Sequence, residues 1–358
     1  MSAASSAIHA SHALLGPDLA PVDDVTIIVD EGRIVQAGPA IDRPGDAVEM
    51  GDATIIPGFV DAHVHIGFFS PKDVLRGGVT TVRDLAWPPE EIWPLVERSE
   101  KPDFEGPRIL AAGQMLTAPN GYPTRAAWAP PGTGCVVASP LEAREAVDRQ
   151  LSRGASIVKI ALNPPAGPTL GAAEVEAIVT AAHDHGARVT GHIHGLAELI
   201  KALDAGVDEL AHMLMGDDLI PDEVISRLVE QEVTVVPTLS VRFEDLGVAV
   251  ENTSRFLAGG GRVIYGTDLG NEGPQPGIDR REIAAMSSAG MDLASIIRAA
   301  TSAAADYLQL DGAGSIEPGR DADLVAVAGI ENAETLTQIR GVWRRGRRVV
   351  EEPPARGT

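Results

Sequence analysis

Two histidines stand two residues apart at the end of an apolar, β-branched run, in the stretch IIPGFVDAHVHIG at 55–67. Side chains at i and i+2 of a strand point to the same face, so His63 and His65 are expected to project together from one strand end. Imidazole nitrogens placed in this way are suited to bind a transition metal. Such pairs also occur by chance on exposed strands, so the rest of the chain decides their meaning.

Further residues that could bind a metal or move a proton lie in other short β-like runs. Lys159 lies in SIVKIAL, His192 and His194 in ARVTGHIH, His212 in VDELAH and Asp268 in GRVIYGTD. Each has an ordinary structural alternative: a core histidine, an aspartate that caps the next segment, or a lysine that extends toward water. Their joint presence is more specific than any one of them.

The apolar setting of Lys159 suggests a particular chemistry. Burial lowers the pKa of a lysine and makes the neutral amine available. A neutral amine can take up carbon dioxide as a carbamate, whose two oxygens can bridge two metal ions.

The elements that must position these residues form a regular alternation of strands and helices between 58 and 305. Helix patterns such as LEAREAVDRQLSRG separate eight β-like runs, and this alternation predicts an α/β fold of the (β/α)8 TIM-like barrel type. The first run is the opening strand in the stretch 55–67, and the others lie at 79–85, 107–114, 156–162, 187–194, 207–212, 233–239 and 261–268. Active sites of such barrels lie at the carboxyl ends of the strands, so we expect the candidate residues to converge there.

The two ends of the chain show a different pattern. Segment 1–57 contains VTIIVDEGRIVQAG, in which Glu31 and Gly32 separate two strand-like runs, and segment 306–358 contains a similar pair in QIRGVWRRGRRVVEE. Such spacing is typical of β-hairpins. Neither end can bury a core alone, so we expect them to form one small β-sandwich domain beside the barrel.

Composition limits the classes of function. The chain has 358 residues, a formal charge of -22 and one cysteine, Cys135. The acidity argues against nucleic acid or an anionic membrane as a partner, and a single cysteine excludes an internal disulfide and a cysteine-based zinc cluster. No apolar run reaches the roughly 20 residues of a membrane span. The first residues lack the basic start of a secretory signal. We expect a cytoplasmic protein with a small-molecule substrate, and a homo-oligomer is left open.

The full set of motifs resembles the amidohydrolase superfamily, in the branch of prolidase-type dipeptidases and imidazolonepropionase-like proteins. TIIPGFVDAHVHIG, GVTTVRDL, ALDAGVDELAHM and GSIEPGRDADLVAV carry the resemblance. It implies two divalent metal ions, zinc first, with manganese, iron or cobalt as alternatives. The implied ligands of the first ion are His63, His65 and Asp268; those of the second are His192 and His212; carboxylated Lys159 bridges them, and His194 is placed to touch substrate.

The implied activity is hydrolysis of an amide-type bond, in a dipeptide, an N-acyl amino acid or a cyclic amide. A hydroxide bridging the metal ions attacks the carbonyl, and Asp268 passes the proton to the leaving amine. One alternative is a mononuclear deaminase, cyclic amidase or lactonase. Against a deaminase, Gly195 follows the HIH motif and the first glutamate is Glu198. A scaffold without catalysis is the other alternative, although no ligand of the set is missing.

The substrate is expected to meet the loops that follow the strands. The longest, MLTAPNGYPTRAAWAPPGTG at 115–134, offers Tyr122, Arg125 and Trp128. Arg242, after the seventh run, is a further candidate. Arginines in these loops could bind a substrate carboxylate through paired hydrogen bonds.

Overall fold

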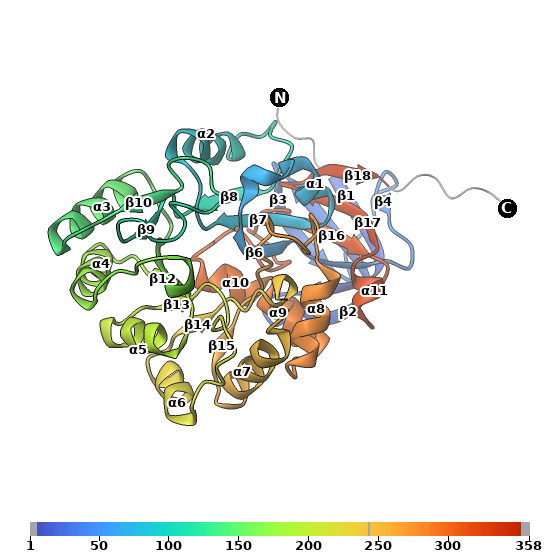
Figure 1. The fold of residues 1–358 in the computed structure, drawn as a ribbon. Helices are drawn as coiled ribbons and strands as arrows, with labels where there is room; N and C mark the ends of the chain where they lie inside the picture. The colour runs from blue at the N-terminus through green and yellow to red at the C-terminus, as the bar shows by residue number, and fades with distance from the viewer. Residues whose placement is uncertain (1–5, 243, 352–358) are drawn as a thin grey trace.

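The terminal segments and the middle of the chain form two adjoining β structures. The computed structural model describes residues 6–242 and 244–351, with a parallel α/β barrel in the middle and a separate sheet beside it (Figure 1). This arrangement confirms the predicted fold class, a barrel accompanied by a small β domain that both chain ends build.

The eight barrel strands follow the predicted runs. They are β6 (Phe59–Val64), β7 (Val79–Asp84), β8 (Arg108–Ala111), β11 (Val158–Leu162), β12 (Val189–Ile193), β13 (Glu209–Leu210), β14 (Thr234–Val235) and β15 (Arg262–Val263). Backbone hydrogen bonds close the ring where the ladders stop: Ser156 N–H donates to Ala111 O at 2.9 Å, and Ala62 N–H donates to Tyr265 O at 3.0 Å. Two extra short strands, β9 (Met115–Thr117) and β10 (Gly134–Val136), lie at the ends of the long loop.

The last three barrel strands are much shorter than the predicted runs. Each of β13, β14 and β15 has two residues. The residues that follow them leave the ladder, and these include His212, Thr238 and Asp268. The polar ends of these runs therefore belong to loops that shape the site.

Helices separate the barrel strands. They are α1 (Pro71–Arg76), α2 (Pro89–Ser99), α3 (Pro140–Ser152), α4 (Ala172–Asp184), α5 (Leu196–Ala205), α6 (Asp222–Glu230), α7 (Leu246–Ala258), α8 (Arg280–Ser288), α9 (Leu293–Ala299) and α10 (Ser302–Tyr307); short 3-10 turns are η1 (Ile66–Phe68), η2 (Pro164–Ala166) and η3 (Leu239–Val241). Local sequence explains where they begin. At α3, Ser139 accepts the N–H of Glu142 and Pro140 occupies the first turn, the usual start of a helix.

The second sheet joins both ends of the chain. Its strands are β1 (Ser6–Leu15), β2 (Ala20–Asp30), β3 (Arg33–Gly38), β4 (Val48–Glu49), β5 (Thr54–Pro57), β16 (Leu324–Val327), β17 (Ile339–Arg344) and β18 (Arg347–Glu351), and a short helix α11 (Ala333–Leu336) lies between β16 and β17. β5 pairs with β1 on one side and with β16 on the other, so blue and red strands lie together in Figure 1. The sheet encloses its own apolar core, which includes Ile27, Ile55 and Leu324.

The predicted hairpin signals are present in this sheet. Glu31 and Gly32 connect β2 to β3 with φ of 47° and 81°, and Arg345 and Gly346 connect β17 to β18 with φ of 47° and 73°. Two-residue turns with positive φ at both positions match the twist of paired strands, which explains the glycine in each turn.

One residue, Gly58, connects the sheet to the barrel. β5 ends at Pro57 and β6 begins at Phe59. The Gly58 N–H donates to Asp323 O at 2.9 Å. A Cβ at Gly58 would lie 2.2 Å from Thr80 Oγ1, so only glycine fits this close approach.

Within 6–242 and 244–351, every helix is too short or too polar to cross a membrane.

Candidate metal centre

The two histidines at the end of β6 turn the same ring atom toward Asp268. Nε2 of His63 lies 3.2 Å and Nε2 of His65 lies 3.3 Å from Asp268 Oδ1, and the three possible ligand atoms lie within 4.8 Å of one another. The opposite ring atom, Nδ1, is 2.8 Å from Ala211 O in His63 and 3.1 Å from Ala86 O in His65. A carbonyl only accepts hydrogen bonds, so Nδ1 carries the proton and Nε2 presents a lone pair.

These three residues form a set of electron-pair donors that fits a metal ion. Oδ1 of Asp268 is buried and accepts no hydrogen bond of ordinary geometry from the described residues. Lone pairs that face one another in a buried site repel unless a cation lies between them. Two imidazoles and a carboxylate are the donors that zinc and other first-row divalent ions take. The chain therefore presents a metal-binding group at this point.

The pKa values show how the same group behaves without a cation. Burial and the nearby Lys159 hold the pKa of His63 well below its usual value. Burial also lowers the pKa of His65, but the adjacent Asp268 carboxylate outweighs burial and the pKa is raised overall. A proton on His65 would then occupy the position that a metal ion could take.

A buried carboxylate, Asp61, holds the two strand ends together. It accepts the His63 N–H at 3.1 Å, the Thr267 N–H at 3.1 Å and the Thr267 Oγ1–H at 2.6 Å. Asp268 itself has a left-handed backbone with φ of 56°, and its N–H donates to His63 O at 2.7 Å. Burial raises the pKa of Asp61 to about 7, although these hydrogen bonds act in the opposite direction.

The second group consists of His192 and His212. Nδ1 of His192 lies 3.0 Å from Nε2 of His212, whose Nδ1 lies 2.8 Å from Thr238 Oγ1. Nε2 of His192 lies 3.0 Å from Nδ2 of Asn163. Burial holds the pKa of both histidines well below the usual value, so both rings are neutral.

The orientation of the Asn163 amide decides whether this second group can bind a cation. When Nδ2 of Asn163 donates to Nε2 of His192, the ring proton of His192 lies on Nδ1. Nδ1 then donates to Nε2 of His212. Oδ1 of Asn163 is buried and has no hydrogen-bond partner among the described residues. A half-turn of the amide would place Oδ1 on Nε2 and move the ring proton there. Nδ1 of His192 and Nε2 of His212 would then both present lone pairs.

Lys159 lies on β11 in the same cavity. Its side chain is 0% exposed, and Nζ has no hydrogen-bond partner among the described residues. Burial lowers the pKa of the Lys159 ammonium to about 7, although the charge of Asp268 acts in the opposite direction. A substantial fraction of the amine is therefore neutral near neutral pH, which is the form that reacts with carbon dioxide.

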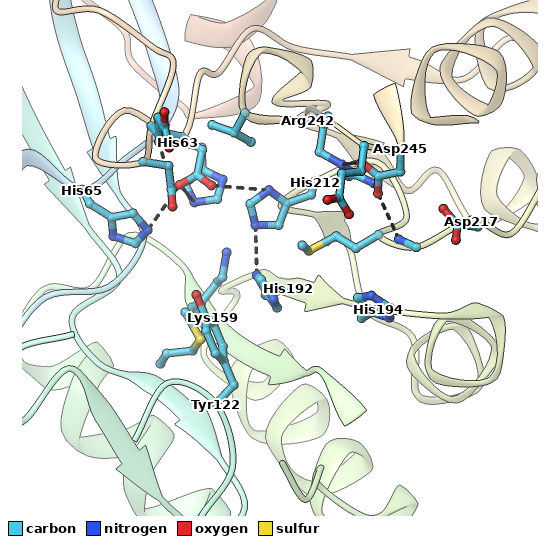
Figure 2. Close-up of a pocket in the computed structure, with 18 residues that line it drawn as sticks. His63, His65, Tyr122, Lys159, His192, His194, His212, Asp217, Arg242 and Asp245 are labelled. Carbon is cyan, nitrogen blue, oxygen red and sulfur yellow. Dashed lines mark hydrogen bonds and ion pairs between the residues drawn. The ribbon is translucent and has the colours of Figure 1, made fainter. Parts of the chain in front are cut away.

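Lys159 and the candidate metal ligands His63, His65, His192, His212 and Asp268 line one pocket of about 620 Å³. Figure 2 shows His63, His65, His192, His212 and Lys159 around a common space, with Tyr122 at its edge. The ring of Tyr122 stacks on His192 with centroids 4.6 Å apart. Nε1 of Trp128 donates to Tyr122 Oη at 3.1 Å, and the Trp128 ring lies 5.0 Å from that of His65. The long loop thus places an aromatic wall against both histidine groups.

The structure brings most, but not all, of the predicted residues to this pocket. Those that line it are His63, His65, Tyr122, Lys159, His192, His194, His212, Arg242 and Asp268. Trp128 supports the wall from behind Tyr122 and His65. Arg125 lies elsewhere: its side chain is exposed and donates to Asn120 Oδ1 at 2.5 Å.

Arg242 lines the pocket, but its donors are already engaged. The guanidinium pairs with both oxygens of Asp245, with Nε 2.7 Å from Oδ1, and donates to Met213 O at 2.8 Å and Leu214 O at 3.1 Å. These bonds tie the loop after β14 to the loop after β13. Arg242 could form the expected paired hydrogen bonds with a substrate carboxylate only if these existing bonds were broken.

Several residues that hold the centre in place were not predicted from the sequence. Asp84 accepts the N–H of Ile66 at 2.8 Å and of Ala86 at 3.1 Å, and so fixes the backbone after His65 and the segment whose carbonyl contacts His65 Nδ1. Asp61 and Asp84 each gave a signal, since an acid within an apolar strand must be held by hydrogen bonds. Asn163 and Thr238 gave none, because their partners are distant in sequence.

The chain is similar to known proteins over most of its length. A family model, the amidohydrolase family, matches residues 54–349. The chain is 26% identical over 292 residues to an uncharacterized protein of Mycobacterium tuberculosis, covering 76% of this chain and 68% of the relative. It is 22% identical over 284 residues to the ochratoxinase of Aspergillus niger, covering 64% of this chain and 58% of the relative.

The solved structure of a Xaa-Pro dipeptidase with bound methionine in the active site has a similar fold. It superposes with a TM-score of 0.81 at 25% identity, over 96% of this chain and 99% of that chain. The similarity therefore extends over the barrel and the terminal sheet alike.

Proposed function

The chain belongs to the amidohydrolase family and is a hydrolase that acts on C–N bonds, and we propose that it cleaves an amide-type bond in a small molecule at a centre of two divalent metal ions. The proposed substrates are dipeptides, N-acyl amino acids and cyclic amides. Zinc is the first candidate metal.

The buried amine of Lys159 carries this proposal. An amine that is 0% exposed, without a hydrogen-bond partner among the described residues, is costly unless it has a role. It lines the same pocket as the two histidine groups. As a carbamate it would supply two anionic oxygens between a first ion on His63, His65 and Asp268 and a second ion on His192 and His212.

Bound divalent ions would lower the pKa of a water molecule and polarise the substrate carbonyl. Asp268 is the residue placed to handle the proton. Its carboxylate lines the pocket, and Oδ1 has no hydrogen-bond donor among the described residues. It can accept the proton of the attacking water and return it to the leaving nitrogen.

Tyr122 and His194 are the proposed substrate contacts. Tyr122 Oη accepts a hydrogen bond from Trp128, so its own proton is available to an oxygen of the substrate. Burial raises the pKa of Tyr122 above its usual range, which keeps that proton in place. His194 is half-buried and lines the pocket, where it can orient the leaving group.

Metal analysis together with a substrate screen tests the proposal. Purified enzyme should contain about two divalent ions per chain, and zinc- or manganese-loaded enzyme should hydrolyse members of a panel of dipeptides, N-acyl amino acids and lactams. One reproducible ion, with deamination or lactone cleavage in place of amide hydrolysis, would favour a mononuclear enzyme. Failure to bind metal and to hydrolyse any compound would indicate a scaffold.

A further inference from the structure

Three of the carboxylates that line the pocket are free. The loops after β13, β14 and β15 contribute Asp217, Glu244 and Glu272, which line the pocket and are exposed. Among the described residues these three side chains have neither a hydrogen bond nor an ion pair. We refer to Asp217, Glu244 and Glu272 as the acidic rim.

The two cations that line the pocket do not neutralise the acidic rim. Arg242 is buried and forms its ion pair with Asp245. Lys159 is fully buried on β11, among the residues of the metal centre. The rim therefore presents three negative charges to whatever enters.

Apolar side chains belong to the same loops as the rim. Met215 precedes Asp217 by two residues, Val241 precedes Glu244 by three, and both are half-buried in the pocket lining. Apolar surface next to carboxylates matches a side chain that has an alkyl stem and a charged head.

The rim belongs to a chamber built to hold a ligand. Buried polar atoms without hydrogen-bond partners among the described residues, Lys159 Nζ and Asp268 Oδ1, lie in the same pocket. A cluster of acids on an ordinary surface would have no such neighbours.

We propose that the amide substrate carries a positively charged side chain, of the alkylammonium or guanidinium type found in lysine and arginine. Its stem packs on Met215 and Val241, and its charge faces the acidic rim. This inference rests on the proposed hydrolysis of amides and adds the substrate class. An acidic side chain that faced the rim would meet like charges, and Arg242 could not offset them because it is already paired with Asp245.

Matched substrates that differ only in charge test the proposal. Metal-loaded enzyme is assayed with alanyl-lysine against alanyl-norleucine, lysyl-alanine against norleucyl-alanine, and α-N-acetyl-lysine against α-N-acetyl-norleucine. In at least one pair the lysine compound should have about tenfold higher kcat/KM, the effect of a few partly exposed ion pairs. Added salt should reduce this ratio, since it screens exposed charges.

Variants of the acidic rim test whether its carboxylates cause the preference for the lysine compounds. In the triple variant Asp217→Asn, Glu244→Gln, Glu272→Gln, the lysine-to-norleucine ratio of kcat/KM should approach one. Glu251→Gln makes the same change of charge on the exposed face of α7, outside the pocket lining, and should keep the wild-type ratio.

The possible failures are distinguishable. Hydrolysis of norleucine compounds as fast as their lysine partners in every pair would overturn the charge proposal and leave amide hydrolysis intact. A high ratio that persists in the triple variant would overturn the role of the rim. Absence of hydrolysis of every pair and of the whole panel would instead contradict the proposed function.

Discussion

The two halves of the proposed metal centre differ in how complete they are. In the first half, His63 and His65 present lone pairs to Asp268, and backbone carbonyls fix both rings. In the second half, the rings of His192 and His212 are hydrogen-bonded to each other, and Lys159 has no hydrogen-bond partner among the described residues. The first half needs only a metal ion, whereas the second needs a rotated amide and a modified lysine as well.

This difference indicates which groups determine whether each half can bind a metal ion. Ligands fixed by backbone carbonyls have one tautomer and are ready to bind. Ligands fixed by a side-chain amide can exist in two proton arrangements, only one of which binds a cation. The second ion is therefore expected to bind more weakly and to depend on carbon dioxide. Five predictions test this contrast.

Replacing the proton carrier should have the largest effect. Asp268→Asn should lower kcat by about 10³–10⁴-fold, because an amide cannot accept the proton of the attacking water. Metal should still bind, since the two histidines are unchanged. Steady-state kinetics and metal analysis of the same preparation check this, and an unaltered kcat would rule out the proton role.

Replacing Asp61, which supports the first half, should alter how the free energy of unfolding depends on pH. The pKa of Asp61 in the folded chain is about 7, against 3.8 when unfolded. The unfolded chain therefore ionises first, so the contribution of Asp61 to stability is full below pH 4 and is lost as pH rises toward 7 and beyond. The loss amounts to up to about 4 kcal/mol.

Asp61→Asn removes this titration but can keep the hydrogen bonds to His63 and Thr267. Denaturant unfolding of the metal-free protein between pH 4 and pH 8 should show a flatter profile for the variant than for the wild type. Parallel profiles would mean that Asp61 is ionised throughout.

Removing the bridging amine should affect the second half selectively. Lys159→Ala should lower kcat/KM by roughly 100-fold and reduce the metal content from two ions to one. Short carboxylic acids should restore part of the activity, because the cavity left by the lysine can take a carboxylate. Lys159→Met fills that cavity and should not be rescued; full activity in either variant would exclude a bridge.

Replacing Asn163 should have a smaller effect, and the replacement should decide whether affinity for the second ion falls or is kept. Asn163→Leu should weaken binding of the second ion by about 10–100-fold, because nothing then holds the proton on Nε2 of His192. Asn163→Asp should bind that ion at least as tightly as the wild type, since a carboxylate can only accept. Titration of the second equivalent of metal distinguishes the two variants. Equal affinities would contradict the proposed half-turn of the Asn163 amide.

The mildest change concerns Thr238. Thr238→Val removes the oxygen that lies 2.8 Å from His212 Nδ1 and should weaken the second ion by less than about tenfold. Thr238→Ser retains the hydroxyl and serves as the control. If valine affected the first ion instead, the division into two halves would be incorrect.

Much of the fold could be predicted because its signals are local. Alternating apolar runs, helix patterns and the turns at Glu31–Gly32 and Arg345–Gly346 depend on neighbours in sequence, and the structure has all of them. The metal-binding group of His63, His65 and Asp268 was also accessible, since parallel strands of a barrel end at one face.

The rest depends on contacts that no local pattern encodes. Asn163 and Thr238 meet His192 and His212 only because separate loops converge. Arg242 gave the signal of a substrate clamp, yet its position three residues before Asp245 lets the two pair within the same loop. The acidic rim is likewise spread over three loops, each with an unremarkable sequence.

The junction at Gly58 has a consequence for the order in which the molecule is assembled. The strand that bears His63 continues from β5, which pairs with β1 on one side and on the other with β16, whose residues lie some 270 positions later in the chain. A pairing of such long range forms late in folding. During synthesis the barrel can therefore be nearly complete while β5 still lacks its second neighbour, β16. The C-terminal strands therefore complete the support of the strand that bears His63 only after every proposed metal ligand has been synthesised.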